Sequence, residues 1–214
     1  MVLGCPALFA IPLCCFSAAG WLAATSSGLF VSPDTGASWH LLPFPARQLA
    51  ANSILAVDRQ LWATTSGRIL YSIDAGRTWH RRDLPPSAGR ALRLTSASAR
   101  ELLATAETGL FISHDFGVSW KQSAHGLPAA PPENVAVSGQ IWIAAMPAGG
   151  LYITEDQGES WNRLSGTIPE GFFPVLAGFG PTRGIFAASA TEGLFALELN
   201  PSPAPANNPA AGRR

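Results

Sequence analysis

The sequence is poor in charge and contains almost no lysine. Charged residues make up 13% of its 214 residues, against roughly 25% in an average soluble domain. Fourteen basic side chains balance fourteen acidic ones, and Lys121 is the only lysine. The arginines are scattered and form no basic run. Such a distribution produces no net positive electrostatic field, which is what attracts nucleic acid or an anionic membrane surface. We therefore expect neither partner.

Cysteine is nearly absent, and its placement excludes two kinds of site. The three cysteines, Cys5, Cys14 and Cys15, all lie within the first fifteen residues. No Cys or His pair has the spacing of a metal site, and no framework of disulfides can be built from them. The sequence therefore predicts neither a metal nor a cofactor.

No apolar run is long enough for a membrane span, although the first twenty residues are strongly apolar. Residues 1–19 lack a basic start and are interrupted by Pro6 and Pro12, so a cleaved signal peptide is the less favoured of two interpretations. In the other, residues 13–16 form a strand, because "LCCFSAAGWLAAT" aligns with "ILAVDRQLWATT" further along the chain. The compartment stays open.

What the sequence does contain is a repeat. "SPDTGASWH" from Ser32 returns as "SIDAGRTWH", "SHDFGVSWK" and "TEDQGESWN", with its aspartates 40, 41 and 41 residues apart. Each unit also contains three short apolar runs separated by Gly, Pro and Ser turns, and none has a helical period. Four strands in about forty residues are typical of a propeller blade. The sequence thus predicts an all-β propeller with four full blades and a fifth, partial one.

We call the repeated segment, Ser/Thr-x-Asp-x-Gly-x-Ser/Thr-Trp, the aspartate motif. Its residue types predict a tight hairpin turn between the third and fourth strands of each blade. The aspartate can accept hydrogen bonds from backbone N–H groups, the glycine can adopt positive φ, and the tryptophan can bury its ring. We therefore expect a structural role, with all tryptophans at least half buried on one rim. The residues are Asp34, Gly36, Trp39, Asp74, Gly76, Trp79, Asp115, Gly117, Trp120, Asp156, Gly158 and Trp161.

This motif resembles the Asp-box, or bacterial neuraminidase repeat, of sialidases, xyloglucan-cleaving glycosidases, sortilin-type receptors and photosystem II assembly-factor propellers. The lead-in, as in "GLFISHDFGVSW", is most similar to the xyloglucanase and assembly-factor branches. The resemblance covers residues 13 to about 199. It implies a β-propeller whose motif lies away from the ligand face, and it leaves function open.

The residues needed for catalysis are scarce, so no catalytic residue is assigned. The only tyrosines, Tyr71 and Tyr152, occupy third-strand positions that predict core roles rather than a sialidase nucleophile. A two-carboxylate glycosidase needs a pair of free acids, and the best pair is Glu107 and Glu192 in corresponding turns. A carbohydrate-active propeller, either a glycoside hydrolase or a sialidase-like protein, is therefore the alternative interpretation.

The favoured interpretation is a non-enzymatic binding or assembly module. In a propeller, the loops from each fourth strand to the next first strand share one face with the turns between second and third strands; we call this the loop face. These loops are longer and more varied than the motif turns, and such loops often carry function. We expect a protein partner first and a carbohydrate second. The candidate face residues are Arg47, Arg68, Arg90, Glu107, Glu170 and Phe172.

The two ends of the chain carry separate predictions. Residues 1–199 form a single domain, and the Pro-, Ala- and Asn-rich tail at 200–214 is expected to be disordered. The fifth repeat has no aspartate motif and no sequence for a fourth strand. We therefore expect "VLGCPALF" near the N-terminus to pair with "GLFALEL" and close the ring.

Overall fold

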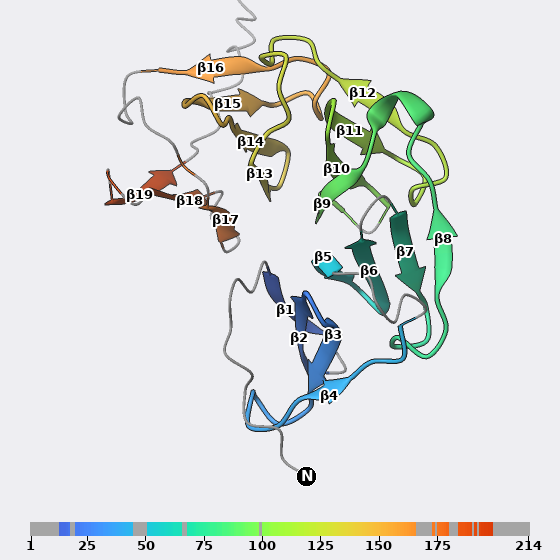
Figure 1. Ribbon diagram of the computed structural model, residues 1–214. Helices are drawn as coiled ribbons and strands as arrows, with labels where there is room; N and C mark the ends of the chain where they lie inside the picture. Colours follow the sequence, from blue (N-terminus) through green and yellow to red (C-terminus); the bar gives the residue numbers. More distant parts are fainter. Residues whose placement is uncertain are drawn as a thin grey trace, which may run out of the picture.

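The computed structural model describes residues 13–17, 20–44, 51–65, 68–98, 100–165, 173, 175–179, 184–189, 191 and 193–198. These residues form five antiparallel sheets arranged around one axis, as Figure 1 shows. Their only helical element is a short 3₁₀ turn, η1 (Pro86–Ala88). The prediction of an all-β, five-bladed propeller is confirmed. None of these residues belongs to a helix that could cross a membrane.

The first three blades each have four strands, and all strands follow one another from the axis outwards. Blade one contains β1 (Leu13–Ser17), β2 (Gly20–Thr25), β3 (Gly28–Ser32) and β4 (His40–Leu41). Blade two contains β5 (Ala51–Val57), β6 (Gln60–Thr65), β7 (Arg68–Ser72) and β8 (His80–Arg82). Blade three contains β9 (Ala91–Ser96), β10 (Leu102–Ala106), β11 (Gly109–Ser113) and β12 (Lys121–Ser123).

Blade four is also complete, whereas three strands of blade five are described. Blade four contains β13 (Asn134–Ser138), β14 (Ile141–Ala145), β15 (Leu151–Thr154) and β16 (Asn162–Leu164). Blade five contains β17 (Val175–Phe179), β18 (Gly184–Ser189) and β19 (Gly193–Glu198). The inner strands contact one another in sequence, β1 with β5, β5 with β9, β9 with β13 and β13 with β17. Strand β1 includes the predicted residues 13–16, which cleavage after residue 19 would remove.

The core lies between the blades rather than inside any one of them. Successive residues of a strand face opposite sides of its sheet. The second strand of a blade therefore packs against both neighbouring blades. Leu61 of β6 packs in a cluster with Leu22 of blade one, whereas the next residue, Trp62, packs in a cluster with Leu102 of blade three. The same arrangement continues through blades four and five. A blade alone would leave both of its apolar faces in water.

The fourth strands begin directly after the motif tryptophans, at His40, His80, Lys121 and Asn162. The reason is that the tryptophan belongs to the turn. Trp79 and Trp120 each donate a hydrogen bond from Nε1 to the carbonyl oxygen of the motif glycine, over 3.0 and 3.1 Å. This contact closes the turn before the strand ladder starts.

Large apolar side chains are exposed where blade five meets blade one. Trp21 of β2 is 42% exposed, although its counterpart in blade two, Leu61, is 3% exposed. Phe186 of β18 is 38% exposed, and its counterpart in blade four, Ile143, is fully buried. Among the described residues, no buried cluster joins these two blades. The seam between blade five and blade one is therefore the least packed of the ring.

The predicted closing strand and the predicted disordered tail both lie outside the described residues. Residues 1–12 directly precede β1, and residues 199–214 follow β19. The expectation that "VLGCPALF" pairs with β19 therefore stays a prediction, and the exposed seam shows how to test it.

Deleting residues 2–11 is expected to lower the melting temperature by about 4–8 °C. Uncovering two large apolar side chains costs at least about 2 kcal/mol, and a chain of this size loses about 2–4 °C per kcal/mol. Differential scanning calorimetry measures the shift, and deletion of residues 201–214 is the matched control, with no shift expected.

A second comparison tests whether the N-terminal segment covers the seam itself. Trp21→Ala should destabilise the full chain, but it should have little further effect once residues 2–11 are gone, because coupled sites are not additive. An unchanged melting temperature after the deletion, or fully additive effects, would contradict the closing strand.

Candidate functional site

The aspartate motif forms a closed set of hydrogen bonds within each turn. In blade three, Asp115 Oδ1 accepts from the Ser113 hydroxyl and from the backbone N–H of Ser119, both over 2.8 Å. Its Oδ2 accepts from the Ser119 hydroxyl over 2.6 Å. The Ser113 oxygen in turn accepts from the N–H of Gly117 over 2.7 Å. Both carboxylate oxygens are thus occupied inside the turn.

The three other turns repeat this arrangement, and it changes the acidity of the aspartates. Equivalent bonds surround Asp34, Asp74 and Asp156. The hydroxyl donor four residues after each aspartate is the largest cause of the shift, and it lowers each pKa from 3.8 to about 2. A carboxyl group with such a pKa carries no proton at neutral pH, so these four residues cannot act as general acids there.

The backbone of the turn has two successive residues with positive φ, of which the sequence predicts only the glycine. The motif glycines have positive φ, as expected, but so does the residue before each of them: Thr35, Ala75, Phe116 and Gln157, with φ of 58° or 59°. Two successive positive φ values are typical of a type I′ hairpin turn. A Cβ on the last glycine, Gly158, would also collide with Ile112 of the preceding blade.

The motif tryptophans connect neighbouring blades. Trp161 is buried, and the other three are half-buried. Trp79 of blade two donates from Nε1 to the carbonyl oxygen of Pro43 over 3.0 Å and packs edge-on against Phe44, both from the chain after β4. Trp161 donates in the same way to the Ser123 hydroxyl of β12 over 2.9 Å. In blades two and four, the motif therefore holds the blade to the one before it.

The tyrosine that a sialidase-like mechanism would require is packed into a blade interface. Tyr71 stacks on Trp62 with ring centroids 5.0 Å apart. The guanidinium of Arg82 lies 4.5 Å from the centroid of the Tyr71 ring. Tyr152 packs against the buried cluster of blades three and four. In the part of the chain that the structure describes, no three His, Cys, Asp or Glu residues are grouped to hold a metal ion.

On the loop face, the structure brings together two of the predicted residues. Arg90 lies just before β9 and Glu107 in the turn between β10 and β11. Arg90 Nε is 2.6 Å from Glu107 Oε1, and the Arg90 backbone N–H donates to Oε2 over 3.0 Å. Arg68 is exposed at the start of β7. Arg47, Glu170 and Phe172 lie outside the described residues.

The contact with Arg90 also bears on the glycosidase alternative. The backbone hydrogen bond from Arg90, followed by its side-chain hydrogen bond, lowers the pKa of Glu107. A glycosidase acid needs a raised pKa instead. Its possible partner, Glu192, lies outside the described residues.

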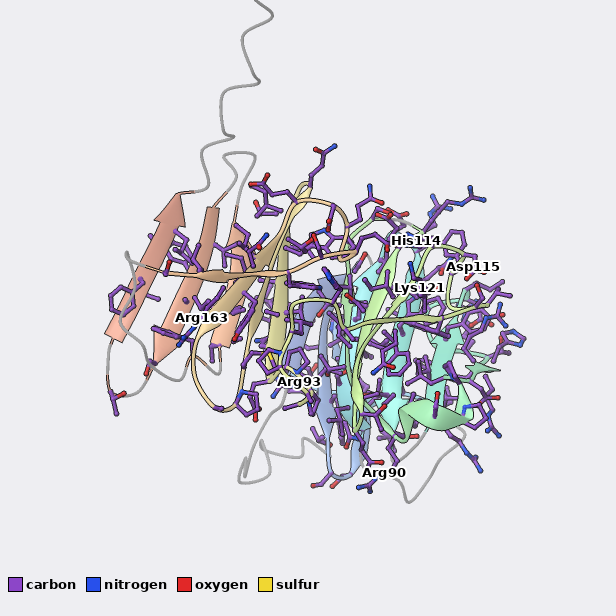
Figure 2. The ribbon with its side chains drawn as sticks, turned by 90° about the horizontal axis from the view of Figure 1, so that it is seen from above. Arg90, Arg93, His114, Asp115, Lys121 and Arg163 are labelled. Atoms are coloured by element: carbon purple, nitrogen blue, oxygen red, sulfur yellow. The ribbon has the colours of Figure 1, made fainter. Side chains whose placement is uncertain are left out.

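Figure 2 places these features on opposite rims: His114, Asp115 and Lys121 lie toward one side of the ring and Arg90 toward the other.

Between the rims, a cavity of about 260 Å³ lies at the axis, lined by β5, β9, β13 and one residue of β17. Of the described residues that line it, Arg93 of β9 alone is charged. Sequence reasoning missed this residue, although its signal was present: an arginine inside the apolar first-strand run "LRL".

With this geometry established, comparison with known proteins identifies the family. The family model of the DUF6242 beta propeller domain matches residues 20–144, which is more than half of the chain. The chain belongs to the DUF6242 propeller family. No curated protein sequence matches this DUF6242 propeller.

Solved structures with the same fold are distant in sequence. YCF48 from Cyanidioschyzon merolae has a TM-score of 0.65 at 17% identity, over 88% of the DUF6242 propeller and 66% of its own chain. A structure of YCF48 bound to D1 peptide has a TM-score of 0.58 at 15% identity, over 83% and 64%. An ancestral GH74 enzyme has a TM-score of 0.67 at 16% identity, over 88% and 30%. The DUF6242 propeller thus spans less than two thirds of each of these chains, and the likeness is one of fold.

Acid should destabilise the protein through the aspartate motifs. Their folded-state pKa values lie below the unfolded value, so this stabilisation is present above pH 4 and is lost as the pH falls from about 4 to about 2. Asp115→Asn removes one of the four groups and should lower the urea midpoint at pH 7 while narrowing the difference between pH 7 and pH 2.5. Urea unfolding followed by tryptophan fluorescence measures both. A variant with the full wild-type dependence on pH would show that the turn bonds do not stabilise the fold.

Proposed function

We propose that this DUF6242 propeller is a non-enzymatic binding or assembly module that holds a polypeptide partner on its loop face. The observation that carries the proposal is the contrast between the two rims. On the motif rim, the aspartates use their carboxylate oxygens within their own turns. On the opposite side, the described loops carry exposed cations, Arg68 and Arg90, and the turn η1.

Two further lines support this interpretation. The aspartate motif resembles the Asp-box, and the resemblance implies that it lies away from the ligand face. A protein of the same fold, YCF48, has been solved bound to D1 peptide. This likeness supports a peptide or protein ligand for the present chain at the level of fold and says nothing of D1 itself.

The carbohydrate-active alternative has less support. The ancestral GH74 enzyme shares the fold at 16% identity. However, the described carboxylate nearest to the loop-face arginines, Glu107, is held by Arg90 and has a lowered pKa. We therefore keep carbohydrate turnover as an outcome to be measured and assign no residue to it.

The test selects peptides from a random display library on the immobilised propeller and compares charge variants. Arg68→Glu combined with Arg90→Glu should weaken the selected peptides at least tenfold, because it reverses two charges at the proposed contact. Folding should persist, since both sites are exposed and an exposed ion pair contributes little. Lys121→Glu on the motif rim is the control, and it should leave binding unchanged. Titration calorimetry gives the affinities.

Three outcomes would contradict this function. The first is equal binding by the loop-face variant, and the second is loss of binding in Lys121→Glu alone. The third is release of reducing sugar from xyloglucan or other β-glucans by the wild-type protein, which would favour the enzyme interpretation instead.

A further inference from the structure

The cavity at the propeller axis has an uneven lining. Its walls are the inner strands β5, β9 and β13, with Leu176 of β17. Apolar residues such as Leu94 and Val135 alternate with the polar side chains of Asn52, Thr95 and Asn134. Arg93 is third in its strand, which starts right after the loop-face residue Arg90, so it lies toward the loop-face end. In Figure 2 it likewise lies between the rims on the Arg90 side.

Arg93 breaks the repeat. In the sheet register it pairs with Thr105 of the second strand. The corresponding pairs are Ser53 with Thr64 in blade two, Asn134 with Ala145 in blade four and Val175 with Ala188 in blade five. These three blades therefore carry an uncharged side chain at this position. An arginine there is not required by the fold.

The guanidinium of Arg93 has no counter-ion in the part of the chain that the structure describes. Among the described residues, none forms a hydrogen bond or ion pair with it, and the cavity lining contains no acidic side chain. The hydroxyl of its cross-strand neighbour Thr105 is buried and is also unpaired. The nearest loop-face carboxylate in sequence, Glu107, is engaged with Arg90. A half-buried guanidinium without a protein counter-ion keeps its donors available to an anionic ligand.

We propose that Arg93 is the anchor of a carboxylate-binding site in the axial cavity. The planar guanidinium donates two parallel hydrogen bonds to a carboxylate, and the low dielectric of the cavity strengthens them. The side chain of Asn52, for which no bond to another described residue is found, lines the same cavity and can donate a further one.

The charge of the cavity favours a carboxylate over a phosphate. A phosphate monoester carries up to two negative charges at neutral pH, whereas Arg93 supplies one positive charge and the described lining holds no second cation. A single carboxylate is neutralised by a single arginine. A volume of about 260 Å³ lies below the usual range of roughly 300–1,000 Å³ for drug-sized ligands, so it suits a small group.

Two sources can present such a group: a free small carboxylic acid, or a carboxylate at the end or on a side chain of a peptide. The site goes beyond the loop-face function, because a free acid would need no partner on the loops. If a peptide is the source, it would lie over the loop face with its carboxylate in the cavity. This second possibility rests on the proposed function.

The experiment titrates the full chain with succinate, with a tetra-alanine peptide bearing a free C-terminus, with the same peptide amidated, and with inorganic phosphate. Shifts of the arginine Nε–Hε signals in NMR report binding. We expect succinate, the free peptide or both to bind and to shift one arginine signal that Arg93→Gln removes. The amidated peptide and phosphate should bind at least tenfold more weakly.

Matched variants separate a site at Arg93 from general attraction to cations. Arg93→Gln should weaken carboxylate binding at least tenfold and Arg93→Lys by an intermediate factor, because lysine keeps the charge but loses the paired donors. Lys121→Gln, on the opposite rim, should leave it unchanged. Melting temperatures confirm that each variant folds.

The proposal fails if no carboxylate binds the wild-type chain, if Arg93→Gln binds as well as wild type, or if phosphate binds as tightly as the carboxylates. It also fails if Arg68 and Arg90, rather than Arg93, control the affinity for succinate. Failure here leaves the loop-face function standing, since the peptide selection depends on Arg68 and Arg90.

Discussion

The packing of blade against blade is the constraint on which the rest of this structure depends. The second strand of a blade places one residue in the interface with the preceding blade and the next residue in the interface with the following blade. Leu61 and Trp62 of β6 are an example. No blade can bury both faces alone, so the blades must form a ring. The motif tryptophans reinforce the same interfaces, because Trp79 and Trp161 bond to the chain of the preceding blade.

This constraint separates the two faces of the ring. On one rim, the repeat demands the same turn in four blades, and serine, threonine, aspartate and glycine satisfy it with bonds inside the turn. On the other, connections between blades are free to differ in length and composition, and they include η1 and the Arg90–Glu107 pair. Variation is therefore tolerated on the side where a partner-specific surface would have to arise.

The axis and the seam are the two places where the repeat is incomplete. At the axis, the inner strands leave a cavity, and one of them carries Arg93 where blades two, four and five have the uncharged Ser53, Asn134 and Val175. At the seam, Trp21 and Phe186 keep the size of interface residues but are exposed, whereas their counterparts elsewhere are buried. An exposed apolar pair of this size at an interface position is typical of a surface that another segment or partner covers.

The sequence alone determined the number of blades, the strand order and the chemistry of the turns, because each of these depends on residues within about forty positions of one another. It placed β1 at residues 13–16 for the same reason. Only the tertiary structure decided the features that join distant residues: the tryptophans docked on the preceding blade, the positive φ before each motif glycine, and the pairing of Arg90 with Glu107. The cavity around Arg93 belongs to this second group, since its walls come from four different blades and exist only once the ring brings their inner strands together.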